Sequence, residues 1–233
     1  MTGGEALSVT DLDAMYGPAQ ALFGVSFSIH PQEIVGIIGR NGAGKTTLVR
    51  SIARVHKKVS GSITFDGREL TGLAPDVVAR LGVSHVREGG KSFLGMSVRD
   101  NLDLALRLAR RRGVRSADLA QVWDWFPFLK DRQEEKVAFL SGGQRQAMAL
   151  SAALLSQPKL LLLDEPSAGL APSVARDFFA SLTRLRERDV TVIVVEQNPL
   201  WLAGLVDRTL LLESGTLGAV GNDAEAPNAG VAT

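Results

Sequence analysis

The sequence contains no cysteine at all, and several other features are scarce. Without thiols the chain forms neither disulfides nor thiolate-ligated metal sites, which fits a reducing compartment. No apolar run approaches the ~18 residues that a membrane-spanning helix needs. Residues 1–5 lack the basic and then apolar pattern of a secretory signal, so we expect no export. The net charge is only +1, so no overall field favours nucleic acid or an anionic surface.

The composition and patterning indicate one α/β domain. The chain has 233 residues, of which 45% are hydrophobic, and this suffices for a full hydrophobic core. Strand patterns occur before residue 87 and after residue 156, and a helical pattern separates them. Strands that alternate with helices predict a parallel sheet, into which the helical stretch would be inserted as a subdomain. We expect the core over about 1–86 and 156–221, the helical subdomain over about 87–155, and a disordered tail over 222–233.

The individual elements follow from short apolar runs that are separated by turn residues. Strands are predicted over residues 7–12, 22–29, 33–38, 62–65, 83–86, 160–163, 190–195, 209–212 and 217–220. Helices are predicted over 46–55, 145–155, 172–188 and 200–206, and Ser116 is a candidate cap for another helix that reaches Trp125.

A glycine-rich loop connects the third predicted strand to the first predicted helix. It consists of Gly39, Arg40, Asn41, Gly42, Ala43, Gly44, Lys45 and Thr46, and Thr47 follows it. The glycines let backbone N–H groups turn inward and surround an anion at a helix N-terminus. Lys45 would reach the β- and γ-phosphates of a nucleotide, and the Thr46 hydroxyl would ligate Mg²⁺. A plain glycine-rich turn with an exposed lysine is the alternative, but the flanking strand and helix favour a nucleotide-binding P-loop.

Two adjacent carboxylates end the strand predicted over residues 160–163. Side chains alternate along a strand, so Asp164 and Glu165 would point to different sides of it. One would hold the Mg²⁺ shell, while the other would face the γ-phosphate and polarise a water molecule. Many strands end in acidic residues that have no catalytic role. The presence of a P-loop in the same chain favours the magnesium and catalytic roles for this pair.

A third motif is made by Leu140, Ser141, Gly142, Gly143 and Gln144, which open a helical pattern. Ser141 would cap that helix, and the two glycines would bring its N-terminus close to an anion. A helix cap with a glycine hinge is the structural alternative. A second phosphate-binding helix end is redundant within one chain, but it has a role if it serves the nucleotide of a second subunit.

With these three motifs the chain resembles the ATP-binding subunit of an ABC transporter over nearly its whole length. The resemblance implies a P-loop NTPase core of the RecA-like type, with antiparallel β elements near the N-terminus. It also implies a head-to-tail dimer, in which each of two ATP molecules lies between the Lys45 loop of one subunit and the Ser141 motif of the other. By the same resemblance Glu165 is the general base, Asp164 holds Mg²⁺ and Tyr16 stacks on adenine. Packing at a strand edge is the alternative role for Tyr16.

Three positions depart from the family pattern. Glu88 stands where a lever-loop Gln usually contacts Mg²⁺ and water and moves with the transmembrane partner. Its carboxylate would still ligate Mg²⁺, but it adds a negative charge beside the γ-phosphate. Gln197 replaces the switch histidine, and as an amide it would still hydrogen-bond the γ-phosphate, but without titrating. Ala171 stands where an Asp is common. The sequence leaves open how these changes affect turnover.

The departures together resemble one branch, the ATPases of Liv-type branched-chain amino-acid importers and of relatives that import urea or short amides. The resemblance implies a second ATPase subunit, identical or homologous, and two transmembrane permease subunits. It also implies an external solute-binding protein that acts indirectly, and a peripheral position on the cytoplasmic face of the membrane. Arg87 and Gly90 depart from that branch, which usually has Pro and Arg there. The sequence identifies neither the solute nor the composition of the dimer.

Other interpretations explain less of the sequence. A P-loop kinase has no use for the Ser141 motif. A soluble ABC ATPase of DNA repair or translation usually carries a long coiled coil or a second cassette. The arginines between 107 and 115 suit a solvated helix face better than nucleic acid or lipid phosphate. The aromatic residues between 123 and 128 suit the core of the helical subdomain, with a permease-docking surface as the alternative.

Overall fold

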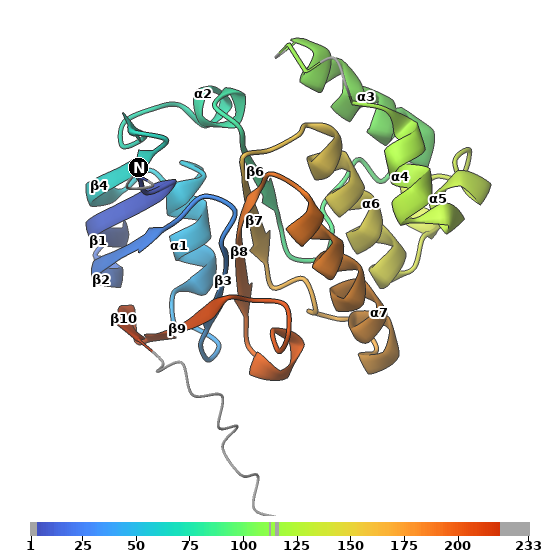
Figure 1. Cartoon of the computed structure of the whole chain (residues 1–233). Helices are drawn as coiled ribbons and strands as arrows, with labels where there is room; N and C mark the ends of the chain where they lie inside the picture. Colours follow the sequence, from blue (N-terminus) through green and yellow to red (C-terminus); the bar gives the residue numbers. More distant parts are fainter. Residues whose placement is uncertain (1–3, 112, 115–116, 220–233) are drawn as a thin grey trace, which may run out of the picture.

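The computed structural model of the chain describes residues 4–219 except 112, 115 and 116, and it has two sheets with helices around them (Figure 1). The predicted α/β architecture is confirmed. The strands are β1 (Leu7–Tyr16), β2 (Ala19–Ile29), β3 (Ile34–Ile38), β4 (Val59–Phe65), β5 (Arg68–Glu69), β6 (Val83–Val86), β7 (Leu160–Asp164), β8 (Thr191–Glu196), β9 (Arg208–Glu213) and β10 (Thr216–Ala219). The α-helices are α1 (Lys45–Ile52), α2 (Pro75–Arg80), α3 (Val98–Arg111), α4 (Leu119–Trp125), α5 (Pro127–Asp131), α6 (Gly142–Leu155) and α7 (Pro172–Leu182).

The larger sheet has six strands in the order β10-β9-β3-β8-β7-β6. All of its strands except β10 run parallel, so the carboxyl ends of β3, β8, β7 and β6 meet at one edge. Strands β7 and β8 are buried along their whole length, which explains their unbroken apolar runs. At that edge Ile38 pairs with Glu196, and Asp164 pairs with Val195.

The smaller sheet is antiparallel, in the order β2-β1-β4-β5, and lies on one side of the larger one (Figure 1). Helix α1 lies between the two sheets and shares a core with them. Leu12, Leu48 and Ile193, from β1, α1 and β8, are fully buried in this core. The antiparallel sheet therefore holds the P-loop helix from the outside.

Helices α3 to α6 follow β6 and precede β7 in the chain. Helices α6 and α7 cover the face of the large sheet that is opposite to α1 (Figure 1). Trp125 and Phe126 are buried in the core on this side, and Trp123 and Phe128 pack against it partly exposed. These aromatic residues therefore contribute to the core, and only Trp123 and Phe128 reach the surface.

Some predicted elements were wrong or incomplete. The helix predicted over 200–206 is only a 3₁₀ turn, Pro199–Trp201, because Gly204 adopts a φ of 73° that a helix cannot continue through. The helix predicted over 172–188 ends at Leu182 and continues as the 3₁₀ helix Thr183–Glu187. Helix α2 and strand β5 were not predicted, since both are short.

The cap of helix α4 also differs from the prediction. Asp118 caps this helix, and its carboxylate accepts a hydrogen bond from the N–H of Ala120. The candidate cap Ser116 and the expected tail over 222–233 lie outside the described residues, as does the end of the last predicted strand. In the arginine cluster Arg107, Arg110 and Arg111 are exposed, as expected for a solvated helix face.

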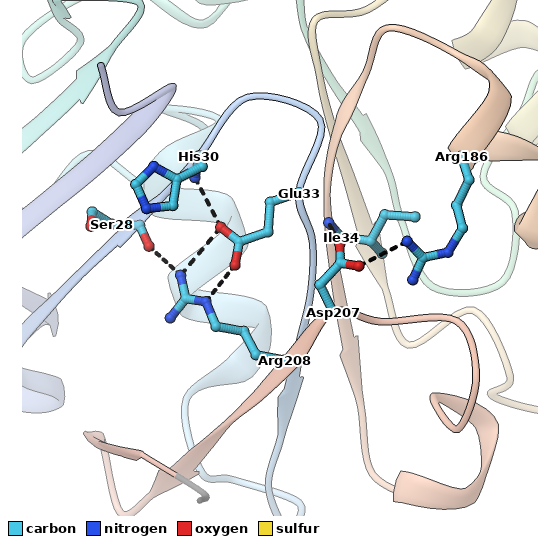
Figure 2. Close-up of polar contacts among 7 residues, drawn as sticks. All are labelled: Ser28, His30, Glu33, Ile34, Arg186, Asp207 and Arg208. Carbon is cyan, nitrogen blue, oxygen red and sulfur yellow. Dashed lines mark hydrogen bonds and ion pairs between the residues drawn. The ribbon is translucent and has the colours of Figure 1, made fainter. Parts of the chain in front are cut away.

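A polar cluster joins the starts of β3 and β9, at the end of the sheet opposite to the P-loop. Figure 2 shows its residues. The Arg208 Nε lies 2.6 Å from the Glu33 Oε1, and Arg208 also donates to the carbonyl of Ser28. Glu33 accepts a further bond from the His30 N–H at 2.9 Å. The pair thus ties the start of β9 to the loop that leads into β3.

Asp207 makes the neighbouring connection in Figure 2. Its carboxylate accepts from the Ile34 N–H and from Arg186, both at 2.8 Å. Burial works against ionisation of this group, but the two donors lower the pKa of Asp207. Ionised Asp207 therefore holds β3 and the 3₁₀ helix after α7 together.

Candidate functional site

The P-loop fills the turn between β3 and α1, and its glycines are required by close packing. A Cβ atom at Gly39 would lie 2.3 Å from the carbonyl oxygen of Leu212. Gly44 has a φ of 106°, and a Cβ atom there would lie 2.9 Å from the carbonyl oxygen of Ala21. Any side chain at these positions would push the loop away from β9 and β2. The backbone of this loop is therefore held in the shape that directs N–H groups toward an anion.

Lys45 is buried inside the loop that it belongs to, with 3% of its surface exposed. Its Nζ donates to the carbonyl oxygens of Gly39 at 2.7 Å and Arg40 at 3.1 Å. The same atom forms an ion pair with the Glu165 Oε1 at 2.9 Å. A buried ammonium group needs a negative partner, and Glu165 fills that role here.

Thr46 and Asp164 meet at the end of the large sheet. The Thr46 hydroxyl donates to the Asp164 Oδ1 at 2.9 Å. Asp164 is 1% exposed, and its Oδ2 has no hydrogen-bond partner among the described residues. The Oδ2 lies 3.7 Å from the Nε2 of His85 on β6, an atom that is also buried and has no hydrogen-bond partner among the described residues.

These two residues fit a magnesium ion. Mg²⁺ prefers oxygen ligands and is usually held by one or two carboxylates together with substrate phosphates and water. Thr46 supplies a hydroxyl, and Asp164 supplies a carboxylate with one unpaired buried oxygen. Among residues 4–219 that the structure describes, no group of three or more His, Asp or Glu side chains is placed to hold a metal. Thr46 and Asp164 would therefore supply only part of the magnesium coordination, and nucleotide phosphates and water would supply the rest.

Glu165 follows Asp164 directly and contacts the neighbouring P-loop residue, Lys45. It has a φ of 45°, an unusual backbone conformation for a residue that is not glycine. Its N–H donates to the Val195 carbonyl at 3.0 Å, which holds the strained turn in place. The two carboxylates therefore contact adjacent residues of the P-loop. The alternation expected along the strand does not extend to Glu165, because β7 ends at Asp164 and the Glu165 backbone is left-handed.

Tyr16 lies at the end of β1, beside the start of α1. Its ring centroid is 4.5 Å from that of His56, and its hydroxyl is 3.5 Å from the Thr47 Oγ1. The side chain is 46% exposed. One part of the ring therefore packs on His56, and another part is open to a ligand. Stacking on adenine stays a prediction.

The predicted cap of helix α6 is confirmed. The Ser141 hydroxyl accepts from the Gln144 N–H at 3.3 Å, and the Gln144 side chain accepts from the Ser141 N–H at 2.9 Å. A Cβ atom at Gly143 would lie 2.2 Å from Val174 of α7, so this position packs too closely for a side chain. No hydrogen bond or ion pair within the described part of the chain connects this motif to the P-loop.

Glu88 and Gln197 are both exposed, in the turns after β6 and β8 on either side of β7. They therefore lie at the same edge of the sheet as Glu165. Gly90, in the same loop as Glu88, is buried, and a Cβ atom there would lie 2.6 Å from the carbonyl group of Arg145. The loop after β6 thus touches the first turn of α6 backbone to backbone.

Glu196 is a residue of this site that the sequence analysis did not assign. It ends β8, is 1% exposed, and accepts bonds from the Ser167 N–H and hydroxyl, each at 2.8 Å. Burial raises the pKa of Glu196, the Ser167 bonds oppose this, and the nearby charge of Glu165 adds to the rise. The available signal in the sequence was an acid that directly follows the strand predicted over 190–195.

The fold and this edge of the sheet together define a P-loop ATP-binding protein. The chain belongs to the ABC transporter family: residues 22–168 match the family model described as "ABC transporter". It is an ATP-hydrolysing cassette. None of the described helices is long and apolar enough to cross a membrane.

Individual relatives agree with this assignment. The chain is 39% identical to BraG of Pseudomonas aeruginosa, a high-affinity branched-chain amino acid transport ATP-binding protein, over 91% of this chain and 90% of that one. It is 33% identical to LivF of Archaeoglobus fulgidus, a probable branched-chain amino acid transport ATP-binding protein, over 90% of this chain and 89% of that one. A crystal structure of a nucleotide-free ATP-binding cassette from an ABC transporter superposes with a TM-score of 0.78 at 25% identity, over 93% of this chain and 90% of that one.

Proposed function

We propose that this ATPase energises the uptake of branched-chain amino acids, or of related small solutes, through a separate permease. The observation that carries the catalytic part is the meeting of Lys45, Glu165 and the Thr46–Asp164 pair at one edge of the sheet. The transported class rests on the similarity to BraG and LivF, whose names state branched-chain amino acid transport.

In this proposal the P-loop N–H groups and Lys45 bind the β- and γ-phosphates, while Tyr16 stacks on adenine. Thr46 and Asp164 would hold Mg²⁺, Glu88 is a further candidate ligand, and the ion would supply positive charge to the phosphate oxygens. Glu165 takes the proton of the attacking water. The water oxygen bonds to the γ-phosphorus as the bond to the bridging oxygen of ADP breaks, and Gln197 hydrogen-bonds the γ-phosphate.

The working form is a head-to-tail dimer. Gly142 and Gly143 lie in the first turn of α6, where N–H groups have no acceptor within the helix and favour an anion. It has no contact with the P-loop of its own chain within the described residues, which supports a role at the nucleotide of a second subunit. That subunit is identical or homologous.

The permease would dock on the helical side of the molecule. A cavity of about 640 Å³ opens between α2, β6, α3 and α6, and its lining includes Arg87, Lys91 and Phe93. Phe93 is 60% exposed, and all three residues belong to the loop that follows β6 near Glu88. An apolar segment of a transmembrane partner would cover Phe93 and place the ATPase at the cytoplasmic face of the membrane. An external solute-binding protein would act only through the permeases, and no nucleic acid takes part.

Reconstitution tests this function. The ATPase is combined in vesicles with the permeases that copurify with it from membranes, and uptake of labelled leucine, urea and a short amide is compared. Uptake of leucine that depends on ATP and on Glu165 supports the proposal. Copurification with ribosomes or DNA contradicts the transport function. Uptake of urea alone contradicts the proposed substrate class.

A further inference from the structure

The carboxylate of Glu196 lies between the two loops that carry the proposed catalytic side chains. Its Oε1 accepts from the Ser167 N–H, and its Oε2 accepts from the Ser167 hydroxyl. The Oε2 also accepts from the Gln197 N–H at 3.2 Å. Ser167 belongs to the turn that begins at Glu165, so one buried carboxylate holds both the Glu165 turn and the Gln197 turn.

The backbone around Glu196 strengthens this arrangement. The Glu196 carbonyl accepts from the N–H of Gly39 at 3.3 Å, at the start of the P-loop. The preceding residue, Val195, accepts from the Glu165 N–H at 3.0 Å. The end of β8 therefore contacts three separate segments: the P-loop, the turn with the base, and the turn with the γ-phosphate ligand.

We propose that Glu196 is a positioning residue for ATP hydrolysis, one that keeps Glu165 and Gln197 in a single arrangement around the γ-phosphate. It is 1% exposed and bonds within the protein, so it acts through these two residues and not on the substrate. The inference rests on the proposed role of Glu165 as the general base.

The chemistry of the site explains why a carboxylate is needed there. Two acceptor oxygens receive three donors from Ser167 and Gln197, and an ionised carboxylate is the only common side chain of that size with two acceptors and no donor. An amide in its place keeps one acceptor and turns its NH₂ group toward an N–H or a hydroxyl. Glu196→Gln therefore loses either the bond from the Ser167 N–H or the bond from the Gln197 N–H, because an NH₂ group accepts neither, and the volume of the side chain does not change.

The test compares Glu196→Gln and Ser167→Ala with wild type in steady-state ATP hydrolysis, and measures binding of a fluorescent ATP analogue separately. Loss of hydrogen bonds to a charged group predicts a kcat about 10- to 100-fold lower for Glu196→Gln. KM and the dissociation constant of the analogue stay within about twofold, because the P-loop contacts are kept. Ser167→Ala removes one bond only, so its loss of kcat is smaller. The double variant is no slower than Glu196→Gln, since both changes break the same link.

Glu213→Gln is the matched control, because Glu213 also ends a strand of the large sheet, β9, but is exposed and is separated from β8 by β3. It keeps full kcat. Unchanged kcat in folded Glu196→Gln overturns the proposal, as does a loss that appears in KM alone. If Glu196→Gln does not fold, Ser167→Ala tests the positioning role instead, and a normal kcat in that variant overturns it.

Glu165→Gln separates this inference from the function on which it rests. An inactive Glu165→Gln together with a fully active Glu196→Gln keeps the proposed base and rejects the positioning role. An active Glu165→Gln with an inactive Glu196→Gln makes Glu196 itself the base, which overturns both assignments.

Discussion

Lys45 and Glu165 are paired with each other, with 2.9 Å between the Nζ and the Oε1. The phosphate-binding cation and the proposed base thus neutralise one another in the structure described here. In the proposed mechanism a nucleotide has to compete with Glu165 for Lys45. Phosphates that bind Lys45 would release the carboxylate of Glu165 beside the γ-phosphate, where the proposed base is required.

Glu165→Gln should bind ATP more tightly than wild type while it hydrolyses ATP at least 100-fold more slowly. An amide holds Lys45 less strongly than a carboxylate does, so the lysine is more available to the phosphates. We expect an affinity gain of about 3- to 10-fold, which corresponds to roughly 1 kcal/mol. Glu213→Gln serves as the control with the same change of charge at an exposed position that has no proposed role in the site. Near-normal turnover by Glu165→Gln, together with its loss in Glu88→Gln, would move the base to Glu88.

Mixing two inactive variants tests the shared site. Lys45→Ala should lose ATP binding because the phosphates lose their main cation, and Ser141→Arg should bind ATP but fail in turnover. In a mixed head-to-tail dimer both defects fall in one site, and the other site combines an intact Lys45 with an intact Ser141. Hydrolysis should therefore return when the two proteins are mixed. Absence of any recovery, when ATP-dependent dimers still form, contradicts the head-to-tail arrangement. Lys130→Ala, an exposed lysine of α5, is the control for loss of a lysine.

Arg208→Met should destabilise the fold without weakening nucleotide binding. The change leaves Glu33, whose side chain is 13% exposed, without its cation. Breaking such a pair costs about 1–3 kcal/mol after allowance for the partial exposure of Arg208. The cluster lies at the strand ends away from the P-loop, so ATP affinity should stay the same (Figure 2). Urea unfolding of this variant is compared with that of Arg80→Met, which breaks the exposed Arg80–Asp76 pair and should change stability by less than ~0.5 kcal/mol.

Glu69 should make stability sensitive to acid. Burial opposes its ionisation, but hydrogen bonds from Ser62, Thr71 and Ile63 outweigh that effect and lower the pKa of Glu69 from 4.5 to about 2. Because the pKa of Glu69 is lower in the folded than in the unfolded state, ionised Glu69 stabilises the protein at pH values above its unfolded-state pKa. This contribution is lost as the pH falls toward 2. Melting temperatures of wild type and Glu69→Gln should therefore differ at pH 6 and converge at low pH. A constant difference across this range would contradict the shifted pKa.

The sequence predicted those parts of the site that are contiguous. The P-loop, the Asp164–Glu165 pair and the Ser141 cap each carry their chemistry in a few consecutive residues. Glu196 was missed because its role depends on Ser167, which is distant in sequence and meets it only through the order of the strands. His85 likewise reaches Asp164 only because β6 and β7 are neighbours.

Local patterns failed where backbone geometry decides. Residues 200–206 have helical spacing of apolar side chains, but Gly204 turns the chain out of the helix. Short elements such as α2 have too few residues for a periodic signal. Gly90 departs from the branch pattern, and the structure accounts for the glycine by its approach to Arg145, since no side chain fits between the two backbones.

The contact between Gly90 and Arg145 couples the loop after β6 to the first turn of α6, so we expect the two to move together. The backbones at Gly90 and Arg145 are in close contact, and no flexible side chain lies between them that could change its rotamer to absorb a displacement. Force applied to this loop from outside the chain would tilt α6 instead of being absorbed locally. Ser141 caps the end of α6 that the loop touches, so this end would move together with the loop.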